Sequence, residues 1–506
     1  MRIERYITLF VSTPCAMSTI TKLESEFRSA LLGLAVGDAL GVPVEFTSRA
    51  TRQRDPVTGM RAFGTHHQPA GTWSDDASLT FCLAEALAAG YSVRGLAVKC
   101  VRWVDEQFWT PHGRVFDIGI TTREALSKLK KQASTSSPLV GGRDEMSNGN
   151  GALMRILPLA FYQEQASMVD RFQLIADASA ITHGHVRSAV ACFLYLETAR
   201  CLRQGLNPAS AYAHLCQTAQ TQLAELHIPD AEIKHFKRVL GGALATLPES
   251  AIASSGYVVH TLEAALWCLL RHDTYSATVL AAVNLGEDTD TTGAVVGGLA
   301  GLYYGEEMIP EEWLGVLVRR ADIEDLAHRT AIRCMPLTRP LANSYWATPQ
   351  VLGCEYPGDL DPEKARFKLT SLLQAGITDF YDLTEVHELA PYEDLLQTLA
   401  VEHGVKVFYY RFPIRDVSVP DPATLEAVLK ALGTSVTAGR KAAVHCWGGV
   451  GRTGTVIGCH LVRAQQLTGA EALARIDEEW QGVAKRDRKP HSPETTAQCR
   501  LVEEFR

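Results

Sequence analysis

The sequence has no excess of positive charge and no long apolar run. Its 506 residues include 49 lysines and arginines against 57 aspartates and glutamates, which gives a formal net charge of −8. This balance gives no reason to expect a nucleic-acid partner, whose phosphates need a basic surface. The sequence also has no stretch of the ~18 continuous apolar residues that a membrane helix requires, so no membrane partner is expected.

Closely spaced cysteine pairs are missing as well. None of the 12 cysteines forms a Cys-x-x-Cys pair, the spacing of thiolate metal sites and redox motifs. Cys82, Cys192 and Cys268 lie in apolar, helix-periodic contexts and are predicted to be small buried hydrophobic residues. Residues 1–20 resemble a signal peptide only faintly, because Thr, Ser and Pro interrupt a short apolar run, and we expect a disordered extension there.

A chain of this length is predicted to fold as more than one domain. From 21 to 335, apolar residues recur at intervals of three and four, and strand-like alternation is nearly absent. This pattern predicts one large all-α domain. Its clearest helical segments are 24–40, 79–89, 172–181, 188–202, 257–270 and 275–283.

Residues 336–349 contain three prolines and no periodicity, and they are predicted to be a linker. The character changes after them, because 350–506 alternates short strands with helices. This alternation is typical of an α/β domain with a parallel or mostly parallel sheet. The predicted strands are 350–354, 379–383, 406–412 and 441–445, and the predicted helices are 364–375, 392–403 and 423–438.

Cys446 and Arg452 enclose five residues, three of which are the glycines Gly448, Gly449 and Gly451. A predicted strand precedes this loop and a helical segment follows it. Such a loop cradles anions, because its backbone N–H groups point inward and the helix dipole adds positive charge. The same field favours a thiolate nucleophile at Cys446, and the planar guanidinium of Arg452 can hold two phosphate oxygens.

With the preceding His445 and the following Thr453, this segment resembles the Cys-x5-Arg loop of cysteine-based phosphatases. The alternative is a buried cysteine beside a glycine-rich turn. A thiolate enzyme needs a reducing compartment, so we expect a cytoplasmic location.

Carboxylates cluster beside glycines and helix starts at 33–46, 71–78 and 286–301. Four aspartates and two hydroxyls in these clusters are enough to bind two Mg²⁺ ions, which prefer oxygen ligands. Without a cation, bringing the acids together would be costly through like-charge repulsion. The alternative is that each acid only caps a helix N-terminus. Glycines 293, 297, 301 and 305 recur every four residues and predict a smooth helical face for close packing.

These clusters resemble the ADP-ribosylglycohydrolase family over roughly 24–330. The matching motifs, in order, are Gly37-Asp-Ala-Leu-Gly41 with Glu45, Trp73-Ser-Asp-Asp76, Asn148-Gly-Asn-Gly-Ala-Leu-Met-Arg155, Thr182-His-Gly-His185 and Asp288-Thr-Asp-Thr291.

The resemblance implies an all-α fold with two Mg²⁺ (or Mn²⁺) ions that grip the ribose hydroxyls and activate water. It implies that Glu45 gates the site or acts in acid–base catalysis, and that Asn148, Gly149 and His183 line the ADP-ribose pocket. The implied metal ligands are Ser74, Asp75, Asp76, Asp288, Asp290 and Thr291. Many members have Thr where this chain has Ser74, and serine keeps the ligand oxygen.

Asp416 lies about thirty residues before Cys446, after a predicted strand, and is the candidate general acid. Asp421 competes for this role, but its position suits a helix cap. From about 344 to 506 the chain resembles dual-specificity and kinase-associated phosphatases. That resemblance implies a phosphocysteine intermediate and no cofactor. Arg452 would clamp the phosphoryl oxygens, Thr453 would assist breakdown, and His445 would orient the loop.

The main interpretation is a bifunctional hydrolase: an all-α domain that removes ADP-ribose from an ADP-ribosylated protein or small molecule, followed by an α/β domain that hydrolyses phosphomonoesters of a phosphorylated protein or small molecule. One alternative is a non-catalytic protein that recognises ADP-ribose or phosphate. Another is sequential processing of one phosphorylated ADP-ribosyl compound. Trp447 either shapes the phosphatase pocket entrance or packs in the core.

Overall fold

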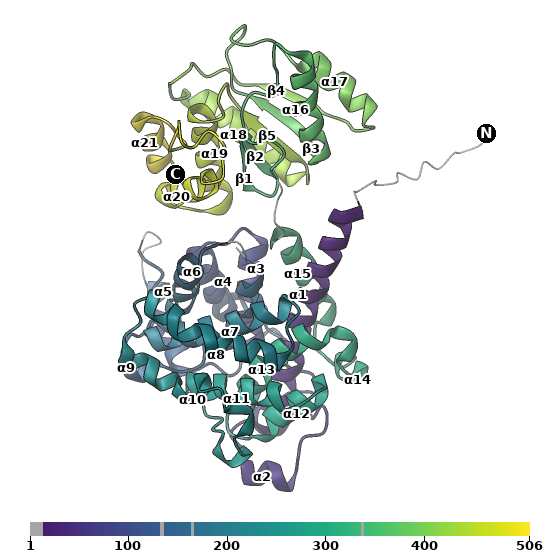
Figure 1. Cartoon of the computed structure of the whole chain (residues 1–506), viewed down its shortest axis with the longest axis vertical. Coiled ribbons are helices and arrows are strands. Elements are labelled where there is room, and N and C mark those ends of the chain that lie inside the picture. The colour runs from purple at the N-terminus through teal and green to yellow at the C-terminus, as the bar shows by residue number, and fades with distance from the viewer. Residues whose placement is uncertain (1–13, 132–135, 163–165, 335–338) are drawn as a thin grey trace, which may run out of the picture. The chain divides into compact units, whose positions relative to one another are not determined.

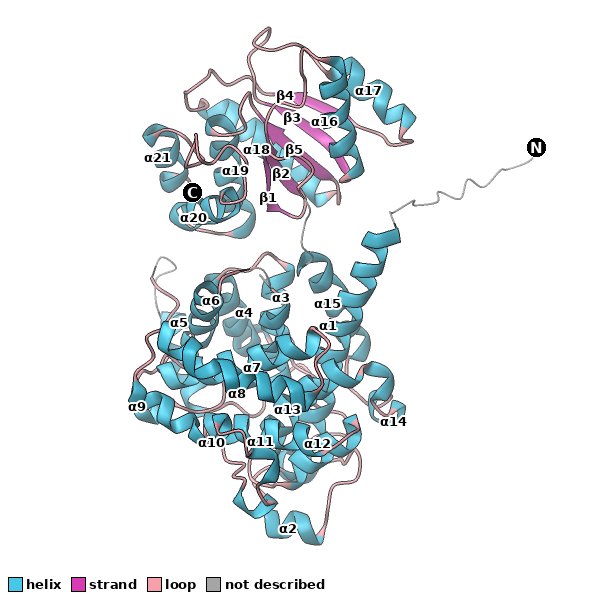
Figure 2. Cartoon of the chain, in the orientation of Figure 1, coloured by secondary structure: helices cyan, strands magenta, loops and turns pink. Residues whose placement is uncertain are grey.

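The computed structural model describes residues 14–131, 136–162, 166–334 and 339–506. The chain divides into two compact units, Met1–Met335 and Pro336–Arg506. Among the described residues, all strands belong to the second unit (Figure 2). The fold class predicted from the sequence, an all-α domain followed by an α/β domain, is therefore confirmed.

Helices make up the first unit. Many begin at a Ser, Asn or Thr whose side chain accepts a hydrogen bond from a backbone N–H of the first turn, as Ser167, Asn207 and Thr274 do. The helices are α1 (Pro14–Gly41), α2 (Arg49–Arg54), α3 (Asp75–Ala88), α4 (Val93–Glu106), α5 (Ile120–Lys131), α6 (Met168–Ala180), α7 (Val186–Arg203), α8 (Pro208–Glu225), α9 (Asp230–Ile233), α10 (Lys237–Leu240), α11 (Val258–Arg271), α12 (Tyr275–Asn284), α13 (Thr289–Tyr304), α14 (Glu311–Leu314) and α15 (Arg320–Cys334).

The helices α1 and α13 cross at the centre of this unit (Figure 1). A Cβ atom at Gly33 or Gly37 would overlap the carbonyl oxygen of a glycine on α13, and one at Gly297 would overlap a carbonyl of α1. Only glycine permits this backbone approach. The predicted stripe of small residues therefore serves packing, except at Gly305, which ends α13 with a φ of +87°.

Residues Lys22–Val44, which include most of α1, are long and apolar enough to cross a membrane by length and composition. In this structure, 94% of an apolar 18-residue stretch within this segment is buried inside the protein. Its neighbours are the other helices of the first unit, so α1 is a core helix here.

The second unit is a five-stranded sheet in the order β1-β2-β5-β3-β4. The pair β1–β2 is antiparallel and the other pairs are parallel, as predicted for a mostly parallel sheet. The elements are β1 (Ser344–Thr348), β2 (Val351–Cys354), α16 (Pro362–Gln374), β3 (Ile377–Asp382), α17 (Glu393–Glu402), β4 (Phe408–Arg411), α18 (Pro422–Thr437), β5 (Lys441–His445), α19 (Gly451–Gln465), α20 (Gly469–Trp480) and α21 (Thr496–Glu504).

Side chains alternate across this sheet with period two. Val351, Tyr381 and Val444 face a core formed with helices α18 to α21. Leu352 and Phe380 face the opposite core, which α16 and α17 complete. The central strand β5 therefore ends between two parallel neighbours, at the edge where open α/β sheets bind ligands.

Two predicted boundaries differ from the structure. The linker predicted at 336–349 is shorter, because Ser344–Thr348 forms strand β1 and pairs with β2 despite the surrounding prolines. Of the extension predicted to be disordered at 1–20, residues 1–13 lie outside the described part of the chain and 14–20 are helical, as the first turns of α1.

Candidate active sites

In the first unit, the N-termini of α3 and α13 carry the predicted metal-ligating side chains. Ser74 caps α3, where its Oγ accepts a hydrogen bond from the backbone N–H of Asp76 and donates one to the carboxylate of Asp76 at 3.0 Å. On α13, the Thr291 hydroxyl donates to the Asp76 Oδ2 atom across 3.4 Å. The two helix starts therefore face each other.

Asp38, on α1, fixes the start of α3. Its carboxylate accepts hydrogen bonds from the backbone N–H groups of Ser74, at 2.8 Å, and Ala77, at 3.0 Å. At the end of α1, a Cβ atom at Gly41 would overlap the backbone of Asp290, which is on α13. Helix α1 thus locates both groups of acids.

Glu45, Asp288 and Asp290 can each offer one carboxylate oxygen to a common point, since these oxygens lie within 4.8 Å of one another. Asn150 donates a hydrogen bond to Asp288 Oδ2 at 2.7 Å and so orients that carboxylate. The Asp288 side chain makes no capping hydrogen bond to α13. The alternative that Asp288 merely caps a helix is therefore not supported.

Burial and mutual repulsion raise the pKa values of these acids. Burial raises the pKa of Asp38 and of Glu45 to about 7. Burial and neighbouring carboxylates raise the pKa of Asp75, Asp76 and Asp290 well above the ordinary range for aspartate. The cluster therefore favours either protons or bound cations.

Two carboxylate oxygens in this cluster have no hydrogen-bond partner. They are Asp76 Oδ1 and Asp290 Oδ2, each on a side chain that is about 1% exposed. A buried, unsatisfied carboxylate oxygen is costly. Oxygen ligands with free lone pairs are what Mg²⁺ and Mn²⁺ require, so these residues fit the cations that the resemblance implies.

His66 and Asp117 join this cluster, and neither was predicted from the sequence. The Nε2 atom of His66 is paired with the Glu45 carboxylate, and this hydrogen bond raises the pKa of His66. Atoms of Glu45, His66 and Asp117 lie within 4.8 Å of one another. His66 ends a single turn of 3-10 helix and Asp117 lies in a loop, both outside the matching motifs, so no sequence pattern marked them.

The residues predicted to line the ADP-ribose pocket lie in one loop region. His183 is buried, its Nδ1 pairs with the Thr182 hydroxyl at 2.8 Å, and burial lowers its pKa to about 3. Its ring lies against Gly149, where an added Cβ would sit 3.4 Å from Nε2. The Asn148 side-chain amide donates to the backbone carbonyl of Glu145 at 3.0 Å, so Asn148 shapes this loop.

In the second unit, Cys446 follows β5 and α19 begins at Gly451, which gives the strand, loop and helix order predicted for the Cys-x5-Arg segment. Gly449 has a φ of +71°, and a Cβ there would overlap the carbonyl of Cys354. The Thr453 hydroxyl lies 3.2 Å from the Cys446 sulfur as a hydrogen-bond donor. The loop is therefore held tightly around a nearly buried sulfur.

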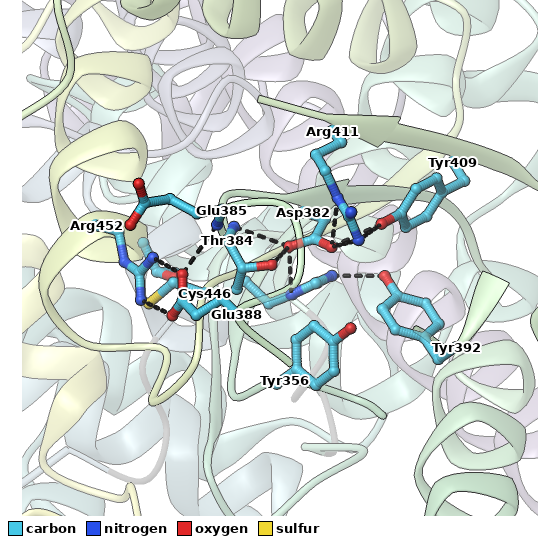
Figure 3. Close-up of polar contacts among 12 residues, drawn as sticks. Tyr356, Asp382, Thr384, Glu385, Glu388, Tyr392, Tyr409, Arg411, Cys446 and Arg452 are labelled. Atoms are coloured by element: carbon cyan, nitrogen blue, oxygen red, sulfur yellow. Dashed lines mark hydrogen bonds and ion pairs between the residues drawn. The ribbon is translucent and has the colours of Figure 1, made fainter. Parts of the chain in front are cut away.

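The Arg452 guanidinium is held in place by Glu388, which follows β3 (Figure 3). Their two hydrogen bonds measure 2.7 and 2.8 Å, and the pairing lowers the pKa of Glu388. The Asp416 carboxylate lies 2.9 Å from the Nη2 atom of Arg452, which also donates to Glu388, and the Asp416 side chain is 55% exposed. Asp421 instead caps α18. Asp416 is thus the acid at the loop.

A buried polar network lies behind the loop (Figure 3). The Nε2 atom of His445 pairs with the Tyr392 hydroxyl at 2.6 Å, and burial lowers the pKa of His445 to about 4. The Nδ1 atom of His445 lies 3.9 Å from Asp382, which also binds Arg411 and Tyr409. This network fixes a neutral His445 beside Cys446.

The sequence analysis missed Glu388, Asp382 and Gln498. The Gln498 amide donates to the backbone carbonyl of Ser418 at 3.0 Å and lies against Gly451, so it joins the loop of Asp416 to the Cys446 loop. Glu388 and Asp382 lie outside the matching motifs. Gln498 lies in the segment 492–505, which belongs to the phosphatase resemblance, but no pattern in that segment assigned it a role. Trp447 is 60% exposed, which excludes the core-packing interpretation.

A family model described as ADP-ribosylglycohydrolase matches residues 19–339, which is more than half of the chain. This chain belongs to the ADP-ribosylglycohydrolase family. A second model, described as a polymorphic toxin system DSP-PTPase phosphatase, matches residues 352–466. The chain is accordingly a hydrolase that joins an ADP-ribosylglycohydrolase domain to a phosphatase domain.

Several known proteins are similar to the ADP-ribosylglycohydrolase domain. An ADP-ribosylarginine hydrolase, Tri1, of Serratia proteamaculans (strain 568) is 32% identical over 62% of this chain and 81% of its own length. An ADP-ribosyl-[dinitrogen reductase] glycohydrolase of Rhodospirillum rubrum is 30% identical over 58% of this chain and 91% of its own. A solved ADP-ribosylglycohydrolase-related protein complex shares 33% identity, with a TM-score of 0.52, over 62% of this chain and all of that chain.

The raised pKa values of Asp38 and Glu45 predict that stability depends on pH. A carboxyl whose pKa is higher in the folded state contributes stability that is present below its unfolded pKa and lost as the pH rises through its folded pKa. Here that window runs from ordinary values of 3.8 and 4.5 to about 7. We expect the metal-free protein to unfold more easily at pH 8 than at pH 5, by a few kcal/mol (~1.4 per pKa unit).

Calorimetry of the ADP-ribosylglycohydrolase domain transition in EDTA measures this effect. The variant Asp38→Asn should reduce the pH dependence, and Asp230→Asn, at an exposed site on α9, should not. Equal stability of the wild-type protein at pH 5 and pH 8 would show that ionisation of these buried carboxyls does not destabilise the metal-free fold.

Proposed function

We propose that the ADP-ribosylglycohydrolase domain removes ADP-ribose from ADP-ribosylated arginine with two Mg²⁺ or Mn²⁺ ions. The observation that carries this proposal is the facing pair of helix starts, where buried Asp76 and Asp290 keep unpartnered oxygens. One relative is an ADP-ribosylarginine hydrolase, and this similarity supports arginine as the residue to which the ADP-ribose is linked. The ions would be held by Ser74, Asp75, Asp76, Asp288, Asp290 and Thr291.

Bound cations would orient the ribose hydroxyls and polarise a water molecule. The chain's own residues prepare the reaction around them. Asn150 orients Asp288, and Asp38 fixes the helix that carries Asp75 and Asp76. Burial raises the pKa of Glu45, which suits it to act as the acid. As the water oxygen bonds to the anomeric carbon and the glycosidic bond breaks, Glu45 donates a proton to the leaving nitrogen, and the proton of the water passes to solvent.

The second half of the proposal is that the phosphatase domain works through a phosphocysteine. The Cys446 thiolate attacks phosphorus, the sulfur–phosphorus bond forms, and the ester bond breaks while Asp416 protonates the leaving oxygen. Arg452 holds the phosphoryl oxygens, in a position that Glu388 sets. Asp416 then takes a proton from the water that releases phosphate and regenerates the thiolate, which the Thr453 hydroxyl stabilises.

The chemistry of Cys446 also bears on the compartment. In the described part of the phosphatase domain, Cys354, Cys446, Cys459 and Cys499 are free thiols. A reactive thiolate among free thiols needs reducing conditions. We therefore keep the cytoplasm as the proposed location.

Chelation should stop the ADP-ribosylglycohydrolase activity alone. In excess EDTA, hydrolysis of ADP-ribosylarginine is expected to fall by at least about 100-fold, because the acids then lose their cations. The rate on para-nitrophenyl phosphate should not change. Asp290→Asn should lose the first activity even with added Mg²⁺, whereas Asp230→Asn should keep it. Hydrolysis that continues undiminished in EDTA would reject the metal assignment.

Replacing the nucleophile should separate the two activities. The variant Cys446→Ser is expected to lose phosphatase turnover, because a serine hydroxyl is not ionised near neutral pH. Its ADP-ribosylarginine hydrolysis should equal that of the wild-type protein. Cys499→Ser, at a half-buried thiol on α21, is the control and should retain both. Comparable phosphate release by Cys446→Ser and the wild type would refute the phosphocysteine.

A further inference from the structure

Phe46 is an exposed aromatic residue in a strained backbone conformation beside Glu45. Its side chain is 70% exposed and its φ is +61°. A bulky residue rarely adopts this left-handed region, and such strained positions tend to occur at functional sites. The conformation is held by a hydrogen bond from the Phe46 N–H to the carbonyl of Glu287, at 2.7 Å. This backbone conformation holds an apolar ring in an exposed position, which burial of apolar surface would disfavour.

Phe46 is one end of a row of three rings. The centroid of the His66 ring lies 6.0 Å from that of Phe46 and 5.5 Å from that of Phe116, with interplanar angles of 55° and 53°. These three rings come from separate segments of the chain. We call Phe46, His66 and Phe116 the ring row.

The ring row lies directly beside the carboxylates of the hydrolase site. His66 pairs with Glu45, and Asp117 follows Phe116 in the chain and approaches both. Glu45 in turn lies within reach of Asp288 and of Asp290, whose Oδ2 atom is buried without a partner. The rings therefore border the place where the glycosidic bond would be cleaved.

Acidic side chains outnumber basic ones around the ring row. Seven carboxylates interact in this cluster: Asp38, Glu45, Asp75, Asp76, Asp117, Asp288 and Asp290. The basic groups that act on Asp117 are His66 and Arg123. Asp117, which follows Phe116 and lies beside His66, is not among the residues proposed to hold the cations, so its carboxylate is left to pair with a ligand. A cationic group is therefore the ligand that this edge of the site suits.

We propose that the ring row and its carboxylates form the leaving-group subsite, which takes the planar guanidinium of arginine. A guanidinium stacks on aromatic faces and pairs with carboxylates, and the two contacts act together where water is partly excluded. A neutral serine side chain would gain neither contact. This proposal rests on the proposed arginine-linked activity, and it assigns the choice of linkage to Phe46 and Phe116.

Agmatine, a small guanidinium compound, is the probe for this subsite. Its inhibition constant against ADP-ribosylarginine hydrolysis should rise about fivefold or more in Phe46→Leu, because leucine keeps apolar area but offers no aromatic face. KM for ADP-ribosylarginine should rise more than kcat falls. Phe46→Tyr should return the inhibition constant of agmatine and the KM for ADP-ribosylarginine to wild-type values. Both variants keep a Cβ atom, so the backbone strain at position 46 is matched.

Three comparisons separate this subsite from a structural effect. The inhibition constant of ADP-ribose should stay within about twofold in Phe46→Leu, since that ligand reports on the rest of the pocket. Phe367→Leu, at a 69% exposed ring of α16, should leave agmatine inhibition at the wild-type value. Phe116→Leu is the second variant, for the case in which Phe46→Leu does not fold. It should weaken inhibition by agmatine in the same way.

The outcomes are distinct. Wild-type affinity for agmatine in Phe46→Leu and Phe116→Leu, with ADP-ribosylarginine still hydrolysed, would overturn the subsite and leave the proposed function standing. Equal weakening of agmatine and ADP-ribose would show a structural effect and would also overturn it. A wild-type protein that does not hydrolyse ADP-ribosylarginine in the presence of Mg²⁺ would overturn both proposals.

Discussion

The close crossing of α1 and α13 is the constraint on which the first site depends. Glycines at 33, 37 and 297 allow the two backbones to touch, and Gly41 then lies against the backbone of Asp290. Because Asp38 on the same helix holds the start of α3, one helix sets the spacing of two groups of acids that lie about 215 residues apart in the sequence. Side chains larger than glycine at these positions would push α1 and α13 apart and so separate the carboxylates.

The two domains use helix N-termini in opposite ways. In the ADP-ribosylglycohydrolase domain, carboxylates occupy the positive ends of α3 and α13, where the helix dipoles partly offset their mutual repulsion. In the phosphatase domain, the first turn of α19 contains no acid, and the loop before it presents N–H groups and Arg452. The first arrangement is suited to cations and the second to anions. One chain therefore combines two sites of opposite charge preference.

The sequence predicted the fold class well because helical periodicity and strand–helix alternation are strong over long segments. The convergence of acids also followed from motifs, since Asp75, Asp76, Asp288 and Asp290 each adjoin a helix start. Strand β1 was missed because the prolines around it obscure a short edge strand. His66, Asp117 and Glu388 were missed because they lie in loops or a single 3-10 turn, where no periodic pattern marks them and only the tertiary fold brings them to the site.

The central claim is that buried acids from two distant helix starts exist together because divalent cations bind between them. Anomalous diffraction from crystals of the full chain soaked in Mn²⁺ tests it most directly. The account predicts two anomalous peaks in the first domain, bounded by Asp75, Asp76, Asp288 and Asp290, and none at Cys446. Crystals that show no manganese among these four aspartates at saturating Mn²⁺ would contradict it.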